Sequence, residues 1–183
     1  MKKIKHSILL LGLMVLFFNF SHLQEWYLLK AEEYGYQITF PTEPVLQQRV
    51  VDSEVGKLKL NMHLLDQTKS DKINGQVYIS GHTAYPEGTV HSDKKEILDD
   101  FFKGAIEGNV KNVNGSLMSE KVIEKDGFPG REIIISLMGD NVRIKARSYL
   151  VGNVMYTTQV LFFTKNNTNP KKDKFLDSFE LLK

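Results

Sequence analysis

Residues 142–164 read VRIKARSYLVGNVMYTTQVLFFT, and this stretch carries the clearest structural signal of the sequence. Both halves are rich in β-branched and aromatic residues, and the pair Gly152-Asn153 separates them. A Gly-Asn pair between two such runs is typical of a two-residue β-hairpin, because the turn requires a positive φ. The sequence therefore predicts an antiparallel strand pair at Val142–Val151 and Val154–Thr164.

Two further strand-like runs precede this hairpin, at Leu117–Glu124 and Arg131–Met138. The connections between the runs are rich in Gly, Asn, Asp and Pro, at Asp126–Gly130 and Gly139–Asn141. Such short polar connections are typical of turns between neighbouring strands. The C-terminal half is therefore predicted to be an antiparallel meander.

The N-terminal half contains more strand-like runs. Residues Tyr36–Phe40 alternate apolar and polar side chains and end at Pro41, and three longer runs follow at Val45–Val51, Leu58–Leu65 and Val77–Tyr85. Strict alternation is typical of a strand with one buried face. In the second long run the apolar residues fall on one face and the polar ones on the other, so His63 is expected to face solvent.

Two helices complete the prediction. Residues Asp93–Glu107 carry an apolar stripe at helical spacing, and Gly108 is placed to end the helix. A short final helix is expected after Pro170, with Phe175 and Leu176 turned inward. The fold class is therefore α+β: an antiparallel sheet of about six to eight strands, flanked by one main helix and a short C-terminal helix.

Residues 1–24 are interpreted as an export signal or an N-terminal anchor, not as part of the fold. Three lysines precede an apolar run at Ile8–Phe18, which has the length of a signal-peptide core and is short for a membrane span. No A-x-A cleavage pattern follows, and residues 7–24 carry no formal charge, so cleavage and membrane anchoring both remain open. Residues 25–34 are expected to be a linker or a single helical turn, and residues 35–183 a single domain. In both cases the domain is exported, to a periplasmic or extracellular location.

Composition sets further limits. The chain has 183 residues, 42% of them apolar, which is enough for one domain with a substantial core. It contains no cysteine, which excludes disulfides, thiolate nucleophiles and Cys-based metal sites. The formal charge is +2, but without Lys2, Lys3 and Lys5 the chain keeps 21 basic and 22 acidic residues. The predicted mature domain is therefore almost neutral.

Four segments resemble a known family. They are Gly35–Pro41 (GYQITFP), Gly127–Glu132 (GFPGRE), Arg147–Gly152 (RSYLVG) and Phe175–Phe179 (FLDSF). Together they are similar to the small exported bacterial domains related to the PsbP-like fold, over about residues 34–183. The resemblance implies an antiparallel sheet flanked by helices and a non-enzymatic accessory role. In photosynthetic members the fold assists the assembly of a membrane complex and the retention of its calcium and chloride, but no residue of this chain matches an ion-binding or docking position.

No catalytic signature stands out. The sequence contains no phosphate-binding glycine motif and no G-x-S-x-G nucleophile elbow. A divalent metal held by His82, His91 and a carboxylate is the sharpest catalytic hypothesis, against a plain polar strand end and loop. Asp99 and Asp100 are adjacent on the main helix and are interpreted as a solvated face, because sequence neighbours on a helix do not face one another. Nucleic-acid binding is not expected, since no basic cluster is interleaved with aromatic residues.

The basic residues of the second half form the other candidate site. Arg143, Lys145 and Arg147 alternate along one strand and share a face, and Arg131 is expected close to them across the sheet. These four residues are candidates for binding an anion or an acidic partner. The alternative is that they form ion pairs with carboxylates such as Glu132 or Asp177.

The sequence as a whole predicts an exported, non-catalytic binding or assembly-accessory domain of the bacterial cell envelope. Its partner is expected to be an envelope protein or a small ligand, with no cofactor, and with membrane contact only through an uncleaved N-terminal segment. Two alternatives are a metal-dependent hydrolase that uses His82 and His91, and a structural domain tethered by its N-terminal helix.

Overall fold

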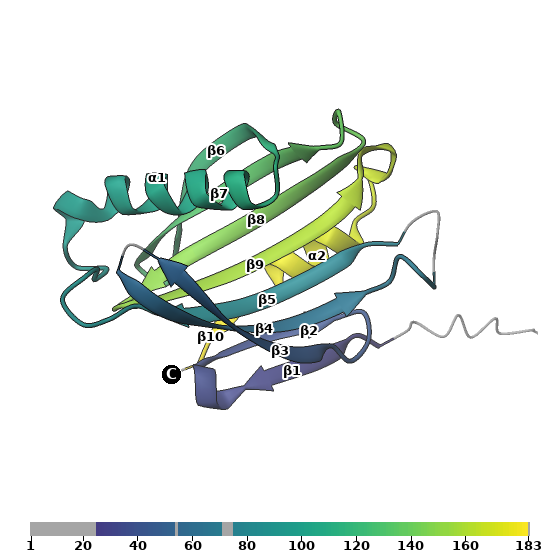
Figure 1. The fold of residues 1–183 in the computed structure, drawn as a ribbon. Coiled ribbons are helices and arrows are strands. Elements are labelled where there is room, and N and C mark those ends of the chain that lie inside the picture. The colour runs from purple at the N-terminus through teal and green to yellow at the C-terminus, as the bar shows by residue number, and fades with distance from the viewer. Residues whose placement is uncertain (1–24, 54, 71–74, 183) are drawn as a thin grey trace, which may run out of the picture.

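The computed structural model describes residues 25–53, 55–70 and 75–182. The expected signal or anchor, residues 1–24, lies outside the described residues. Within them the chain forms two antiparallel sheets and two α-helices (Figure 1). The predicted α+β class is confirmed.

The larger sheet has seven strands, all antiparallel to their neighbours. In spatial order they are β3 (Val45–Ser53), β4 (Gly56–Asp66), β5 (Val77–Ala84), β9 (Val154–Phe163), β8 (Val142–Val151), β7 (Phe128–Leu137) and β6 (Ser116–Lys125). The strand number lies within the predicted six to eight. The free edges are therefore β3 and β6.

Two hairpins show how local sequence sets the meander. The β8–β9 turn is Gly152-Asn153, as predicted, and Gly152 has a φ of 58°. The β6–β7 turn is shorter than expected, because Asp126 and Gly127 form it alone, with φ values of 51° and 85°. Two successive positive φ angles are what a tight hairpin needs, so β7 begins at Phe128 and the expected connection through Gly130 is wrong.

A second, three-stranded sheet was not anticipated. It has the order β1 (Tyr27–Ala31), β2 (Tyr36–Phe40) and β10 (Glu180–Leu181). Residues 25–34 are therefore not a linker: β1 pairs with β2 along its whole length, and a single 3₁₀ turn, Glu32–Tyr34, joins them. Only the helical turn within that segment matches the expectation. The pairing partner lies outside the segment, so the pattern of residues 25–34 alone did not indicate a strand.

Helix α1 spans Lys95–Asn112, and α2 spans Lys171–Asp177. Gly108 does not end α1, because the helix continues for another turn that packs Val110 and Val113 against buried isoleucines of β7 and β8. Burial of these apolar side chains offsets the cost of a glycine inside a helix. In α2, Phe175 and Leu176 are buried as predicted.

The two faces of the large sheet are covered differently (Figure 1). One face, termed the α1 face, carries α1 over β7 and β8, where Phe102 and Ile106 are buried. The other face, termed the β2 face, packs against the small sheet and α2. His63 lies on this second face and is only 9% exposed, because Tyr36 of β2 packs on it. The expectation that His63 faces solvent is therefore wrong.

Candidate functional site

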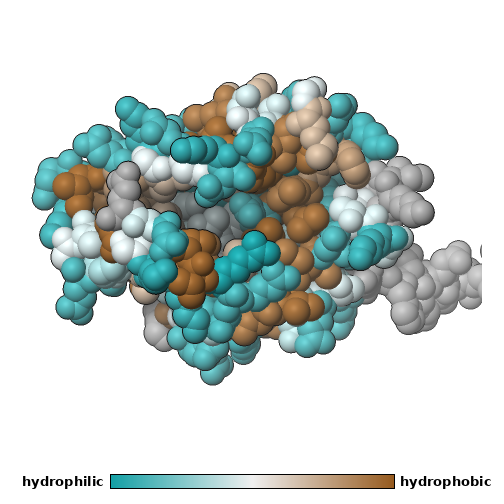
Figure 2. Space-filling view, viewed as in Figure 1, coloured by the Kyte–Doolittle hydropathy of each residue, from teal (hydrophilic) through white to brown (hydrophobic). Residues whose placement is uncertain are grey.

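Helix α1 covers only part of its face of the large sheet. The uncovered part, over β4, β5 and β9, forms a groove of about 540 Å³ between α1 and the β3–β4 hairpin. Figure 2 shows the hollow near the centre of this face. Small-molecule and peptide sites have volumes of roughly 300–1,000 Å³, so the groove is large enough to hold a ligand.

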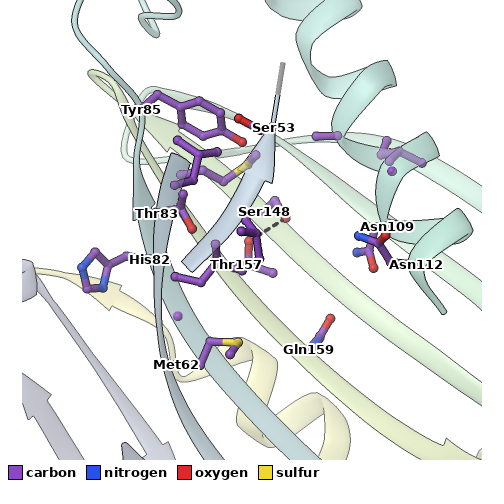
Figure 3. Close-up of a pocket in the computed structure, with 18 of the residues that line it drawn as sticks. Ser53, Met62, His82, Thr83, Tyr85, Asn109, Asn112, Ser148, Thr157 and Gln159 are labelled. Atoms are coloured by element: carbon purple, nitrogen blue, oxygen red, sulfur yellow. Dashed lines mark hydrogen bonds between the residues drawn. The ribbon is translucent and has the colours of Figure 1, made fainter. Parts of the chain in front are cut away.

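The floor of the groove combines apolar and uncharged polar side chains. Its apolar part comes from Leu60, Met62, Ile79 and Met155. Its polar part comes from Thr83, Ser148, Thr157 and Gln159, and Figure 3 shows Ser148 and Thr157 in the middle, joined by a hydrogen bond of 3.1 Å. Asn109 and Asn112 line the groove from α1 (Figure 3).

The charged residues at the groove are already paired. Asp52, at the rim, lies 2.9 Å from Lys57, and Arg131 is paired with two carboxylates. By contrast, the side chains of Thr83, Gln159, Asn109 and Asn112 make no hydrogen bond to another group in the part of the chain that the structure describes. The groove therefore offers hydrogen-bonding groups without net charge.

Two glycines shape the groove. A Cβ at Gly108 of α1 would meet no atom within 4 Å, so the helix leaves open space at this position. A Cβ at Gly81 of β5 would lie 2.7 Å from the carbonyl oxygen of Asn61, so the close pairing of β4 and β5 requires glycine there. A glycine inside a helix lowers its stability, and Gly108 is the one glycine of α1 that lines the groove. A Cβ at Gly104, the other glycine of α1, would also meet no atom within 4 Å, but Gly104 does not line the groove.

Arg143, Lys145 and Arg147 lie on the β2 face, as the alternation predicted, and each contacts a carboxylate. Arg143 is 2.6 Å from Asp140, and Lys145 is 3.1 Å from Asp173 and 3.6 Å from Glu132. Arg147 lies 2.7 Å from both Glu132 and Asp177, the two carboxylates named in the ion-pair alternative. Burial alone would lower the pKa of Arg147, but these two carboxylates raise it overall.

Arg131 does not join this ladder. It lies opposite Ser148 in the β7–β8 register, whereas its neighbour Glu132 lies opposite Arg147. Residues directly opposite in an antiparallel pair share a face, so Arg131 points to the α1 face and away from the other three cations. There it is buried, contacts Asp99 at 2.5 Å and Glu120 at 3.2 Å, and lies 4.6 Å from the centre of the Phe102 ring. The expectation that Arg131 lies close to the other three cations is wrong, because the residue opposite Arg147 is Glu132, and Arg131, one residue earlier, points to the other face.

The structure does not bring His82 and His91 together. His82 on β5 lies opposite Tyr156 of the β8–β9 hairpin, whereas His91 lies beside Gly152 of the same hairpin. Tyr156 and Gly152 are four residues apart, which corresponds to about 13 Å at the rise of a strand. His91 contacts Asp93 at 3.4 Å. Among the described residues, no group of three or more His, Cys, Asp or Glu side chains could hold a metal ion.

His82 instead belongs to a polar cluster between the two sheets. Its Nε2 lies 3.0 Å from the Asn61 amide nitrogen, and the Tyr34 ring packs on it in a tilted arrangement, with 4.1 Å between the ring centres. Next to it, the Tyr36 hydroxyl is 2.9 Å from Nδ1 of His63 and 3.1 Å from the Ser80 hydroxyl. Burial raises the pKa of Tyr36 to about 12 and lowers the pKa of both histidines.

Sequence reasoning missed the groove because its lining carries no motif. Thr157 and Gln159 are the only available signal: two polar side chains at alternate positions of a strand in the middle of a sheet. Their exposure depends on how far α1 reaches across the face, which no local pattern specifies.

Comparison with solved structures identifies the architecture. The structure is similar to that of the cyanobacterial PsbP protein, CyanoP, from Synechocystis sp. PCC 6803, with a TM-score of 0.56 at 12% identity, over 87% of this chain and 94% of that one. The chain has the PsbP-like fold. A protein of unknown function from Pseudomonas aeruginosa, PA94, aligns with a TM-score of 0.38 at 9% identity, over 80% of this chain and 89% of that one.

No family profile and no curated protein matches the sequence. No helix within the described residues of this PsbP-like chain has the length and apolar character needed to cross a membrane.

Proposed function

We propose that this chain is an exported, non-catalytic binding domain of the bacterial cell envelope, and that the groove beside α1 holds an uncharged segment of a partner protein. The observation that carries the proposal is the uncovered part of the α1 face. Leu60, Met62 and Ile79 are only half-buried there, although they lie on a face of the sheet that α1 covers elsewhere. Apolar surface gathered in a hollow is characteristic of interaction sites.

The side chains around the groove favour a polypeptide ligand. Asn109, Asn112 and Gln159 each carry an amide, which offers both a donor and an acceptor. A peptide backbone presents the same two groups. A charged segment would lose its hydration without gaining an ion pair, because the nearby charges already have partners. The partner segment is therefore neutral, with apolar side chains for the floor.

The N-terminal pattern supports export. Three lysines followed by Ile8–Phe18 are typical of a signal, and the lack of a clear cleavage pattern leaves tethering as the alternative. N-terminal sequencing of the protein recovered from cells distinguishes the two. A start near residues 22–25 means release, and a start at Met1 means a membrane-tethered domain.

The hydrolase alternative receives no support from the geometry. It requires His82 and His91 on one ion, but His82 lies within β5 opposite Tyr156, whereas His91 lies in the loop before α1, beside Gly152 of the β8–β9 turn. The assembly role implied by the PsbP-like resemblance agrees with a binding groove, and it remains part of this proposal.

Two glycines of α1 provide a matched test. Gly108→Leu fills the groove from the helix, whereas Gly104→Leu adds the same side chain to an exposed position that does not line the groove. A photo-crosslinking residue replaces Thr83 on the floor, and cells that produce each variant are irradiated. We expect discrete adducts in the parent and in the Gly104→Leu variant, and their loss in the Gly108→Leu variant. The absence of adducts in the parent, or adducts that persist after Gly108→Leu, would overturn the proposal.

A further inference from the structure

The two free edges of the large sheet differ in how they are protected. The β6 edge carries a bulge between Leu117 and Ser119 and four charged side chains, Glu120, Lys121, Glu124 and Lys125. Bulges and charges are devices that prevent an edge strand from pairing with another chain. The β6 edge is therefore protected.

The β3 edge lacks this protection. Its run VLQQRVV, residues 45–51, contains no bulge and a single charge, Arg49. Val45 and Val50 are 65% and 64% exposed, and Leu46 and Val51 are also exposed. These four residues lie on both faces of the strand, so no single neighbouring layer could cover them all. An additional strand beside β3 would cover both faces together.

We propose that two copies of this chain pair antiparallel through β3, about a two-fold axis at Gln48. In this register Leu46 lies opposite Val50 of the second copy, and Val45 opposite Val51, each twice. Gln47 lies opposite Arg49, so no like charges meet. Pro44 has no backbone N–H and therefore ends the ladder beyond Val45.

Other symmetric registers fit less well. An axis at Arg49 would place the two guanidinium groups opposite one another, which is destabilising. An axis at Gln47 would place Val45 opposite Arg49. Only the Gln48 register matches all four exposed apolar side chains with one another, and this complementarity argues for a second copy over an unrelated strand.

The pairing has a consequence for the binding groove. A two-fold axis between antiparallel edge strands is perpendicular to the sheet, so both copies keep the α1 face on the same side. The dimer therefore presents two grooves on one side of a continuous sheet. The pairing itself rests on β3 and does not depend on the groove's proposed ligand.

The lack of cysteine permits a sharp test, because a single introduced cysteine has no competitor in the chain. Gln48→Cys places two thiols opposite one another at the axis, where Cα separations of about 4.5–5.5 Å suit a disulfide. Val50→Cys is the matched control on the same edge. Its two copies would be offset by four residues, about 13 Å, which is too far for a disulfide.

The chain recovered from the producing cell is analysed by sedimentation equilibrium and oxidised with copper–phenanthroline. We expect a mass that rises to twice the monomer value with concentration, and covalent dimer from Gln48→Cys but not from Val50→Cys. Gln48→Lys should weaken association by about tenfold or more, because it places two ammonium groups opposite one another. Val122→Lys, on the β6 edge, should leave association unchanged.

Three results would overturn the proposal. The first is a monomer at every concentration. The second is equal crosslinking of both cysteine variants, which indicates random collision. The third is a dimer whose dissociation constant is unchanged by Gln48→Lys, which places the interface elsewhere.

Discussion

The histidine pair between the two sheets, His63 buried and His82 half-buried, makes stability depend on pH in a defined window. His63 and His82 lie between the two sheets, and burial lowers the pKa of each below its ordinary value near 6.5. The charge of His63 further lowers the pKa of His82, while Glu33 opposes both shifts. A change from pH 8 to pH 5 is therefore expected to destabilise the fold.

The sign follows from proton binding. Between the ordinary pKa of about 6.5 and the lowered folded pKa values, the unfolded chain binds protons that the folded chain does not. The free energy of unfolding therefore falls as the pH falls through this window. Above about pH 7.5 the free energy of unfolding does not depend on the protonation of these two histidines, and below their folded pKa values it levels off. Each histidine contributes at most about 1.4 kcal/mol per pH unit, so the pair contributes at most about 2.8 kcal/mol per pH unit.

The carboxylates act in a different window. Asp66 and Asp140 have pKa values below 3.8: hydrogen bonds from Thr68 lower the first, and hydrogen bonds from Arg143 lower the second. The stability that these two carboxylates contribute is lost only as the pH falls below their ordinary pKa of 3.8 and through their lowered folded pKa values. The histidine effect is therefore measurable at pH values where these carboxylates remain charged.

Urea unfolding at a series of pH values measures the effect. Trp26 is the only tryptophan; it packs against Tyr78 of the large sheet and Lys174 of α2, so its fluorescence reports on contact between the layers. The double variant His63→Gln/His82→Gln should remove the slope, whereas His91→Gln, in an exposed loop, should retain it. A pH dependence that persists in the double variant, or a parent protein whose free energy of unfolding is constant between pH 8 and pH 5, would show that these histidines do not cause the effect.

Two further predictions concern packing. Gly81→Ala should lower the free energy of unfolding by about 1–3 kcal/mol, because its Cβ would lie 2.7 Å from the Asn61 carbonyl oxygen. Gly104→Ala, in open space on α1, should instead raise the free energy of unfolding by about 0.5–1 kcal/mol. Calorimetry can check both, because Tm shifts by roughly 2–4 °C per kcal/mol. Equal effects of these two substitutions would contradict the packing. Arg131→Met should lower the free energy of unfolding by less than about 1.5 kcal/mol. The side chains of Asp99 and Glu120 are 93% and 41% exposed, so neither carboxylate is left buried without a partner. Asp99→Ala with Glu120→Ala should lower the free energy of unfolding by about 2 kcal/mol or more, since the Gly130 carbonyl is then the remaining hydrogen-bond acceptor for the buried guanidinium among the described residues. The reverse order of the denaturation midpoints of the two variants would contradict this prediction.

Several parts of the structure followed from local sequence. Strand β8 has the predicted bounds and β9 ends one residue before the predicted end, because Gly152-Asn153 both separates the strands and provides the positive φ. The last helix, with Phe175 buried, was predicted from Pro170 and a short apolar pattern. Turn residues and alternation act over two to ten residues, so a single sequence carries that information.

Other parts depended on contacts between distant segments. Gly108 did not end α1, since Val110 and Val113 gain burial against β7 and β8. The polar face of β4 was covered by Tyr36, which made His63 a buried residue. Periodicity shows which residues share a face, but not which layer covers that face.

The α+β class, the meander, the absence of disulfides and the near neutrality of the predicted mature domain all followed from the residues in order along the chain. Three features depend on contacts between distant segments: residues 27–31 form a strand, Arg131 lies apart from Arg147, and α1 leaves a groove over β4, β5 and β9. Local polarity patterns specify elements, because backbone conformation responds to near neighbours. The position of one layer on another depends on the shapes of side chains far apart in the sequence, and the groove is a consequence of that packing.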